Sequence, residues 1–219
     1  QVLGHIRAAQ PECPTLAVKA SLGGPHEGFV DFSALMENAN ESFEPMDAPV
    51  QDIMLMYFTS GTTGMPKMVA HDFNYPLGHL ITGRFWHNLS DESVHLTVAD
   101  TGWAKCGWGK LYGQWIAGAT LFIYDFDKFN AHGMLDMLSK YRVTSFCAPP
   151  TIFRFLIKED LSAWDLSSLT WGCVAGEPLN PEVYSQFLKA TGVELHEGFG
   201  QSETTPLVLT PKWMAPRPG

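Results

Sequence analysis

Short apolar runs alternate with segments of helical spacing along most of the chain after residue 119. The bounded apolar runs predict strands, and the segments between them, with apolar residues three or four positions apart, predict helices. Strands that alternate with helices indicate a parallel sheet with helices packed on it. We therefore expect an α/β fold with a mostly parallel sheet flanked by helices. In chain order the expected elements are a strand over 121–124, a helix from its cap at 130 to 141, a strand over 143–147, a helix over 151–158, a strand over 169–175, a helix over 181–190 and a strand over 193–197.

The first half of the chain shows this alternation less cleanly. A β-like run over 15–20 is followed by a short expected helix over 32–38 and by a polar loop over 40–49. The apolar residues 53–58 predict a buried strand, and 73–89 has the spacing of a helix. The sheet is therefore expected mainly in the second half.

The loop after residues 53–58 is rich in glycine and hydroxyl side chains and reads TSGTTGMPK from Thr59 to Lys67. Its two glycines let the backbone turn tightly, and successive N–H groups can point inward as an anion nest. Lys67 adds a full positive charge, and the hydroxyls add hydrogen-bond donors. These are the parts that a polyphosphate needs. The glycines and hydroxyl residues are Thr59, Ser60, Gly61, Thr62, Thr63 and Gly64.

This loop is not a Walker A loop. That pattern needs Gly directly before the Lys and Ser or Thr directly after it, where this chain has Pro66 and Met68. Residues 68–70 look like another strand rather than a helix. We therefore expect the loop to join the two strands of a hairpin.

Two later turns each follow a predicted strand, so both are expected at the same edge of the sheet. Gly176 begins one of them and allows close approach of the backbone to a ligand. In the other, Phe199 offers a flat face for adenine, Ser202 offers a donor for an α-phosphate, and Glu203 is a hard oxygen ligand suited to Mg²⁺.

Residues Ser60 to Lys67 resemble the phosphate-loop signature of the adenylate-forming enzymes, which include acyl-CoA synthetases, luciferases and peptide-synthetase adenylation domains. Most members have Gly after the Lys, and Met68 is a departure similar to that of the acetyl- and medium-chain acyl-CoA synthetases. The resemblance implies catalytic roles for Lys67 and Glu203, with Glu203 also the metal ligand. It implies nucleotide contacts for Thr59, Ser60, Gly61, Thr62, Thr63, Gly64, Gly176, Glu177, Pro178, Glu197, Gly198, Phe199, Gly200, Gln201 and Ser202. The family usually has Tyr in place of Phe199 and Thr in place of Ser202.

The segment ADTGWAKCGW over 99–108 resembles the segment that lines the acyl site of medium-chain acyl-CoA synthetases. Its tryptophans have an alternative interpretation as core residues. Acetyl-CoA synthetases carry a bulky Trp where this chain has Gly200, so we expect a medium-chain, branched or aryl acid rather than acetate. The acyl-site residues implied by the resemblance are Trp103, Lys105, Trp108, Ala148, Val174, Ala175 and Gly200.

The resemblance implies an enzyme that uses ATP and Mg²⁺ to convert a carboxylic acid into acyl-AMP and then makes its CoA thioester. It also implies that 1–219 is a central fragment of the N-terminal AMP-binding domain, with the C-terminal lid outside it, and that this fragment alone is inactive. Two alternatives stay open. One is another adenylating enzyme, either an aryl-CoA ligase or a peptide-synthetase adenylation domain. The other is a non-catalytic nucleotide-binding protein on the same fold.

Composition narrows the possible partners. The 219 residues include 14 Lys and Arg against 23 Asp and Glu, a net charge of −9, which disfavours binding to a nucleic-acid backbone. The chain contains no apolar run long enough to span a bilayer, so no membrane partner is expected. The four cysteines show no zinc spacing and favour a reducing compartment. We therefore expect a cytoplasmic protein whose partners are the acid, ATP and CoA.

Overall fold

The computed structural model describes residues 2–60 and 64–219. The chain divides into two compact units, Gln1–Asp47 and Ala48–Gly219. Gly61, Thr62 and Thr63 of the predicted phosphate loop lie outside the described residues.

The first unit consists of short elements. Its second helix begins at Asp31, whose carboxylate accepts the N–H of Ser33 at 3.0 Å and so caps the helix. The predicted helix over 32–38 is confirmed, whereas the β-like run over 15–20 is wrong except at its last residue. The elements are α1 (Val2–Ala9), a 3-10 turn (Gln10–Glu12), β1 (Ala20–Ser21), β2 (Val30–Asp31) and α2 (Phe32–Glu37), with β1 and β2 paired in parallel.

The second unit is built on a six-stranded sheet with the strand order β10-β9-β8-β7-β5-β6. Every pairing is parallel except that of the edge strand β10, which runs antiparallel to β9. The predicted α/β fold with a mostly parallel sheet is confirmed. The strands are β5 (Val94–Thr97), β6 (Thr120–Leu121), β7 (Ser145–Ala148), β8 (Trp171–Ala175), β9 (Leu195–Phe199) and β10 (Val208–Leu209).

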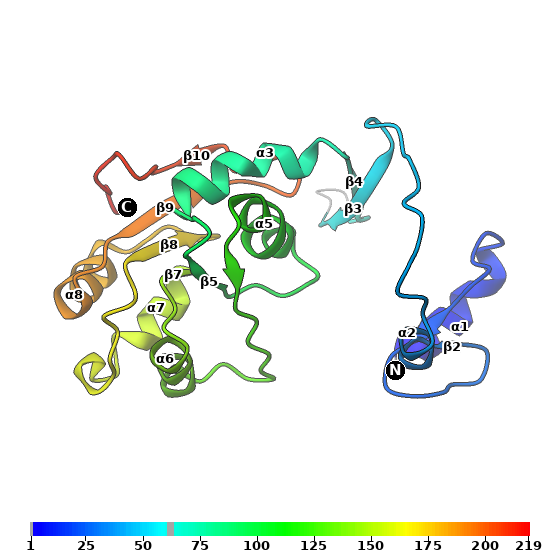
Figure 1. The fold of residues 1–219 in the computed structure, drawn as a ribbon, viewed down its shortest axis with the longest axis horizontal. Helices are drawn as coiled ribbons and strands as arrows, with labels where there is room; N and C mark the ends of the chain where they lie inside the picture. The colour runs from blue at the N-terminus through cyan, green and yellow to red at the C-terminus, as the bar shows by residue number, and fades with distance from the viewer. Residues whose placement is uncertain (1, 61–63) are drawn as a thin grey trace. The chain divides into compact units, whose positions relative to one another are not determined.

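Helices cover both faces of this sheet (Figure 1). On one face, α6, α7 and α8 pack through an apolar cluster that includes Leu135, Phe153 and Phe187. On the other face lie α3 and α5, over a cluster of Trp86, Trp108 and buried cysteines. The helical segments are α3 (Tyr75–Ile81) continued by a π-helical turn (Thr82–Trp86), α4 (Ala104–Cys106) continued by a second one (Gly107–Leu111), α5 (Tyr112–Ala117), α6 (Ala131–Lys140), α7 (Pro150–Leu156), a 3-10 turn (Leu161–Ala163) and α8 (Pro181–Thr191).

The predicted hairpin is present as β3 (Ile53–Thr59) and β4 (Lys67–Asp72), which pair antiparallel. Its first strand is not buried as expected, because Met56 and Phe58 are exposed. The reason is that alternate side chains of β3 point to opposite faces, and Tyr57 packs on the Trp86 and Trp108 cluster while Met56 and Phe58 face away from it.

Most elements predicted for the second half are confirmed with small shifts of their ends. Asn130 caps α6 by accepting the N–H of Gly133 at 2.7 Å, and Gly192 ends α8 in the left-handed conformation. The strand expected over 121–124 is wrong except at Leu121, since β6 is Thr120–Leu121, and the helix expected over 73–89 ends at Trp86. β5 was not predicted, since polar His95 and Thr97 interrupt its apolar pattern.

Candidate functional site

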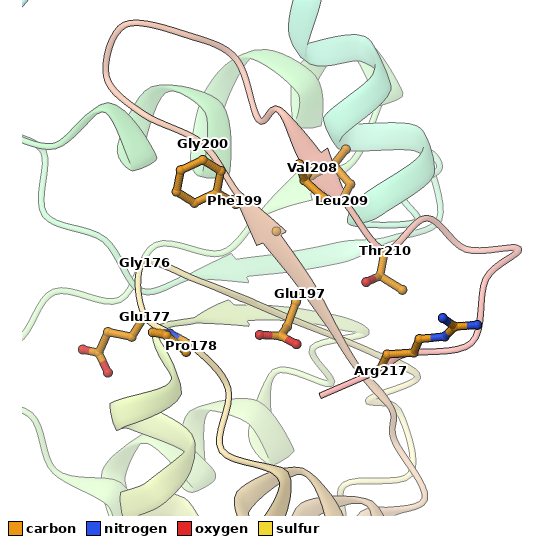
Figure 2. Close-up of a pocket in the computed structure, with 11 residues that line it drawn as sticks. Gly176, Glu177, Pro178, Glu197, Phe199, Gly200, Val208, Leu209, Thr210 and Arg217 are labelled. Atoms are coloured by element: carbon orange, nitrogen blue, oxygen red, sulfur yellow. The ribbon is translucent and has the colours of Figure 1, made fainter. Parts of the chain in front are cut away.

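The carboxyl ends of β8 and β9 open into a pocket of about 550 Å³ (Figure 2). Two turns predicted from the sequence lie side by side here, one after each strand. The Glu197 carboxylate joins them, because it accepts the backbone N–H of Leu179 at 3.0 Å. The pocket is lined by Gly176, Glu177, Pro178, Glu197, Gly198, Phe199, Gly200, Val208, Leu209, Thr210 and Arg217.

Three glycines in or beside these turns are required for different structural reasons. Gly176 has a φ of +103°, a conformation that other residues rarely adopt. A Cβ on Gly198 would lie 2.5 Å from the Trp86 ring, so this glycine admits the indole beneath β9. A Cβ on Gly200 would lie 3.0 Å from Pro206 Cα, where the chain turns back toward β10. Only Gly176 keeps open space around its Cβ position, and this is the glycine best placed for close approach of a ligand.

Phe199 stands at the mouth of the pocket with more than half of its side chain exposed, at 57%. A flat apolar face left open beside two polar turns is suited to stacking on a purine. Thr210 and Arg217 line the same pocket, and the sequence interpretation missed both. They lie far along the chain in a segment without a recognisable motif, and only the return of β10 along β9 brings them here.

Glu177 is held by side chains from α7. Thr151 Oγ1 donates to Glu177 Oε2 at 2.7 Å, and Arg154 Nη2 donates to Thr151 Oγ1 at 2.6 Å. Arg154 also forms an ion pair with Glu177 at 3.4 Å. The carboxylate therefore has a fixed direction and a neutralising partner at the edge of the pocket.

A second pocket of about 390 Å³ lies next to the first. It includes three of the predicted acyl-site residues, Trp103, Lys105 and Ala175, and shares Gly176 and Glu177 with the first pocket. Lys105 Nζ donates to the Ala175 carbonyl at 3.3 Å. Burial lowers the pKa of Lys105, while the nearby Cys147, Cys173 and Glu177 oppose that shift. The pocket is lined by Val98, Ala99, Asp100, Trp103, Lys105, Pro149, Ala175, Gly176 and Glu177.

The other predicted acyl-site residues do not line this pocket. Trp108 is buried, with its ring centroid 5.6 Å from that of Trp86, in agreement with its alternative interpretation as a core residue. Ala148 and Val174 are buried in the apolar cluster under the sheet. Gly200 lines the first pocket instead.

The β3–β4 hairpin holds the described ends of the predicted phosphate loop. Thr59 and Lys67 are register partners, so the two predicted phosphate contacts flank the loop directly. Gly64 has a φ of +89°, which favours glycine at this turn. Lys67 is exposed, so its ammonium group is accessible to a ligand.

Contacts at two points attach the hairpin to the rest of the unit. Tyr57 packs against the cluster of Trp86 and Trp108, and burial raises the pKa of its phenol to about 12. His71 Nε2 lies 2.7 Å from the carbonyl oxygen of Ser202. The sequence shows His71 close after the loop but gives no sign of this partner, which lies 131 residues away.

Gln201, Ser202 and Glu203 form the turn after β9. Thr204 Oγ1 accepts the N–H of Gln201 at 3.2 Å and stabilises the turn, while the Glu203 side chain is exposed. Within the described residues no group of three or more His, Cys, Asp or Glu side chains gathers to hold a metal. A single accessible carboxylate fits Mg²⁺ that takes most of its ligands from phosphates and water.

A family model described as AMP-binding enzyme matches residues 6–219. The chain belongs to the AMP-binding enzyme family. The adenylate-forming resemblance drawn from the loop and the two turns is thus confirmed.

Relatives and solved structures agree with this family. The chain is 37% identical to "Acyl-coenzyme A synthetase ACSM4, mitochondrial" of Rattus norvegicus, over 100% of the chain and 38% of that protein. It resembles the acyl-CoA synthetase of Brucella canis with a TM-score of 0.83 and 28% identity, over 97% of this chain and 40% of that one. The anthranilate CoA ligase AuaEII in complex with anthranoyl-AMP gives a TM-score of 0.87 and 26% identity, over 99% and 42%. The chain therefore spans less than half the length of these AMP-binding relatives.

Proposed function

We propose that this chain carries the nucleotide-binding site of an AMP-forming acyl-CoA synthetase. A carboxylic acid attacks the α-phosphorus of ATP, pyrophosphate leaves, and the thiol of CoA then takes the acyl group from acyl-AMP. The observation that carries the proposal is the contact between His71 of the hairpin and Ser202 of the strand-end turn. This contact, and the fact that residues 48–219 form one compact unit, support a shared site for the β3–β4 hairpin and the two strand-end turns.

Each part of the site has one task in this proposal. Lys67 and the hydroxyl loop hold the β- and γ-phosphates, Ser202 donates to an α-phosphate oxygen, and Phe199 stacks on adenine. Glu203 would hold Mg²⁺, which supplies neutralisation of phosphate charge when bound. Catalysis then consists of positioning and charge stabilisation, without a protein nucleophile. The other proposed nucleotide contacts are Thr59, Ser60, Gly61, Thr62, Thr63, Gly64, Gly176, Glu177, Pro178, Glu197, Gly198, Gly200 and Gln201.

We propose that the acid occupies the second pocket, beside Trp103 and Lys105, with a medium-chain, branched or aryl group. Trp103 is 71% exposed and offers an indole face at this pocket. An aryl-CoA ligase is the second candidate function, and the similarity to an anthranilate CoA ligase favours it. The shared lining residues Gly176 and Glu177 support a place where a carboxylate and an α-phosphate meet.

We also propose that 1–219 is the central part of the N-terminal AMP-binding domain of a longer enzyme, and that it forms no acyl-AMP by itself. The fraction of the relatives that it spans supports this. In the part of the chain that the structure describes, no helix is both long and apolar enough to cross a bilayer. The cytoplasmic location stays a prediction, since the name of the rat relative contains the word mitochondrial.

ATP–pyrophosphate exchange by the intact enzyme, measured over a panel of acids, tests the proposed function. We expect exchange with medium-chain, branched or aryl acids, and CoA thioester when CoA is added. The highest kcat/KM for acetate would overturn the acid assignment. Binding of ATP without exchange for any acid would instead favour a non-catalytic nucleotide-binding protein, and exchange by residues 1–219 alone would overturn the proposed domain assignment.

A further inference from the structure

His71 has no task in the proposed reaction, yet it makes the one hydrogen bond recorded between a hairpin side chain and the turn after β9 within the described residues. Its Nε2 lies 2.7 Å from Ser202 O. A carbonyl oxygen only accepts, so Nε2 carries the proton and donates. The imidazole is therefore oriented by its partner rather than free in solvent.

The accepting carbonyl lies in the peptide group that leads into Glu203. A peptide group is planar, so the carbonyl of Ser202 and the N–H of Glu203 move as one rigid plate. A hydrogen bond that fixes this oxygen also fixes the direction in which the backbone enters Glu203. The Glu203 side chain is exposed, and this backbone sets the direction in which its Cα–Cβ bond leaves the chain.

The donor is held firmly on its own side. The His71 ring stacks on Tyr75 with a centroid distance of 3.9 Å and an angle of 25° between the planes. Tyr57 meets it edge-on at 5.8 Å. His71 is also the register partner of Leu55 in the hairpin. The same two strands carry Thr59 and Lys67 at their far end, so the hairpin links the imidazole to these two predicted phosphate contacts.

We infer that His71 is a positioning residue that couples the phosphate hairpin to the turn carrying Glu203 through the hydrogen bond from Nε2 to the Ser202 carbonyl. This inference rests on the proposed assignment of the two segments to one MgATP site. The hairpin and Glu203 then contact the triphosphate and its Mg²⁺ as one unit. Nucleotides that lack the β- and γ-phosphates gain little from this coupling.

The test measures MgATP and AMP binding by calorimetry in the intact enzyme for the wild type and two His71 variants. His71→Phe keeps a ring that stacks on Tyr75 but removes the donor. His71→Gln loses the ring but keeps an N–H donor of similar reach. His132→Phe is the matched control, because His132 lies exposed on α6.

For His71→Phe we expect MgATP affinity to fall about tenfold, the size of one hydrogen bond, and AMP affinity to fall less than about twofold. His71→Gln should bind MgATP within about threefold of the wild type, and His132→Phe should match it. Unchanged MgATP affinity in His71→Phe would overturn the inference, as would an equal loss of AMP affinity, or a His71→Gln variant as weak as His71→Phe.

Failure of the proposed function gives a different result. If the wild type binds MgATP but exchanges no pyrophosphate with any acid, the ligase proposal fails while the contrast between MgATP and AMP still decides the role of His71. A wild type that binds neither nucleotide contradicts both. Thermal unfolding of each variant separates a loss of binding from a loss of fold.

Discussion

The two faces of the six-stranded sheet are built from different kinds of side chain. Beneath α6, α7 and α8 the buried residues are almost all aliphatic or phenyl groups. Beneath α3 and α5 they include indoles and thiols, and near them lie the fully buried polar side chains of His79, His87, His95 and Gln114. The first face is a conventional apolar core, whereas the second depends on hydrogen-bond geometry as well as on packing.

The difference matters because the hairpin is attached to the polar face. Tyr57 packs on the Trp86 and Trp108 cluster, and Tyr75 of α3 stacks on His71. The two helices of this face touch backbone to backbone, since a Cβ on Gly113 would lie 2.3 Å from the His79 carbonyl oxygen. The apolar face thus supplies stability, and the polar face supplies a fixed support for the phosphate loop.

The largest expected effect is on the apolar face. Phe153 is fully buried, with ring centroids of Phe146 and Phe187 at 5.4 and 5.0 Å. Phe153→Ala should lower the free energy of unfolding by about 3–5 kcal/mol through the cavity that it leaves. Denaturant titration measures this. The control, Phe155→Ala, removes a side chain that is 44% exposed and should cost less than half as much.

A substitution on the polar face should cost less stability but more function. Gly113→Ala forces α3 and α5 apart, and overpacking of this kind costs about 1–3 kcal/mol. MgATP affinity should fall together with stability, because α3 supports His71. Gly4→Ala is the control, since open space surrounds its Cβ position. If Gly113→Ala changed neither quantity, the contrast between the faces would lose its main support.

The pH dependence of stability should come from the polar face. Burial lowers the pKa of both His79 and His95 to about 4, whereas in the unfolded chain they protonate below about pH 6.5. Between these values the unfolded state binds more protons, so the free energy of unfolding falls as the pH drops from about 6.5 toward 4. Each histidine contributes a slope of at most about 1.4 kcal/mol per pH unit.

Replacing His95 by Gln should flatten this slope, as measured by denaturant titrations at about pH 7 and about pH 5. The matched control His132→Gln removes an exposed imidazole and should leave the slope unchanged. An equal slope in wild type and His95→Gln would show that the buried histidine does not govern the acid response.

The smallest expected effect on stability comes from the contact between Arg154 of α7, a helix of the apolar face, and Glu177 of the first pocket. The ion pair of Arg154 with Glu177 is about half exposed, so Arg154→Ala should change stability by less than about 1 kcal/mol. The loss of its hold on Glu177 should still raise the KM for ATP or the acid about threefold. Arg154→Lys keeps a charge but loses the planar donor group, so its KM should lie between those of the wild type and Arg154→Ala. If the KM were unchanged in both variants, Arg154 would not position Glu177 for ligand binding.

The apolar face was largely predictable. Apolar spacing predicted α6, α7 and α8 together with β7, β8 and β9, because burial on one side imposes a period on the sequence. On the polar face, the helix expected over 73–89 was found as α3 and its π-helical turn, but β5 and α5 were not predicted. The segments that form β5 and α5 hold buried histidine, glutamine and glycine, whose burial depends on partners from other elements and so produces no hydrophobic pattern.

The candidate site divides in the same way. The sequence by itself determined the β3–β4 hairpin and the two strand-end turns, because tight backbone turns require particular residue types at fixed neighbouring positions. The phosphate role of the loop stays a prediction. Only the tertiary structure decided that His71 meets Ser202, that Arg154 holds Glu177, and that Trp108 is a core residue. These depend on contacts between residues distant along the chain, and distances of that kind are set by how the sheet and its helices pack.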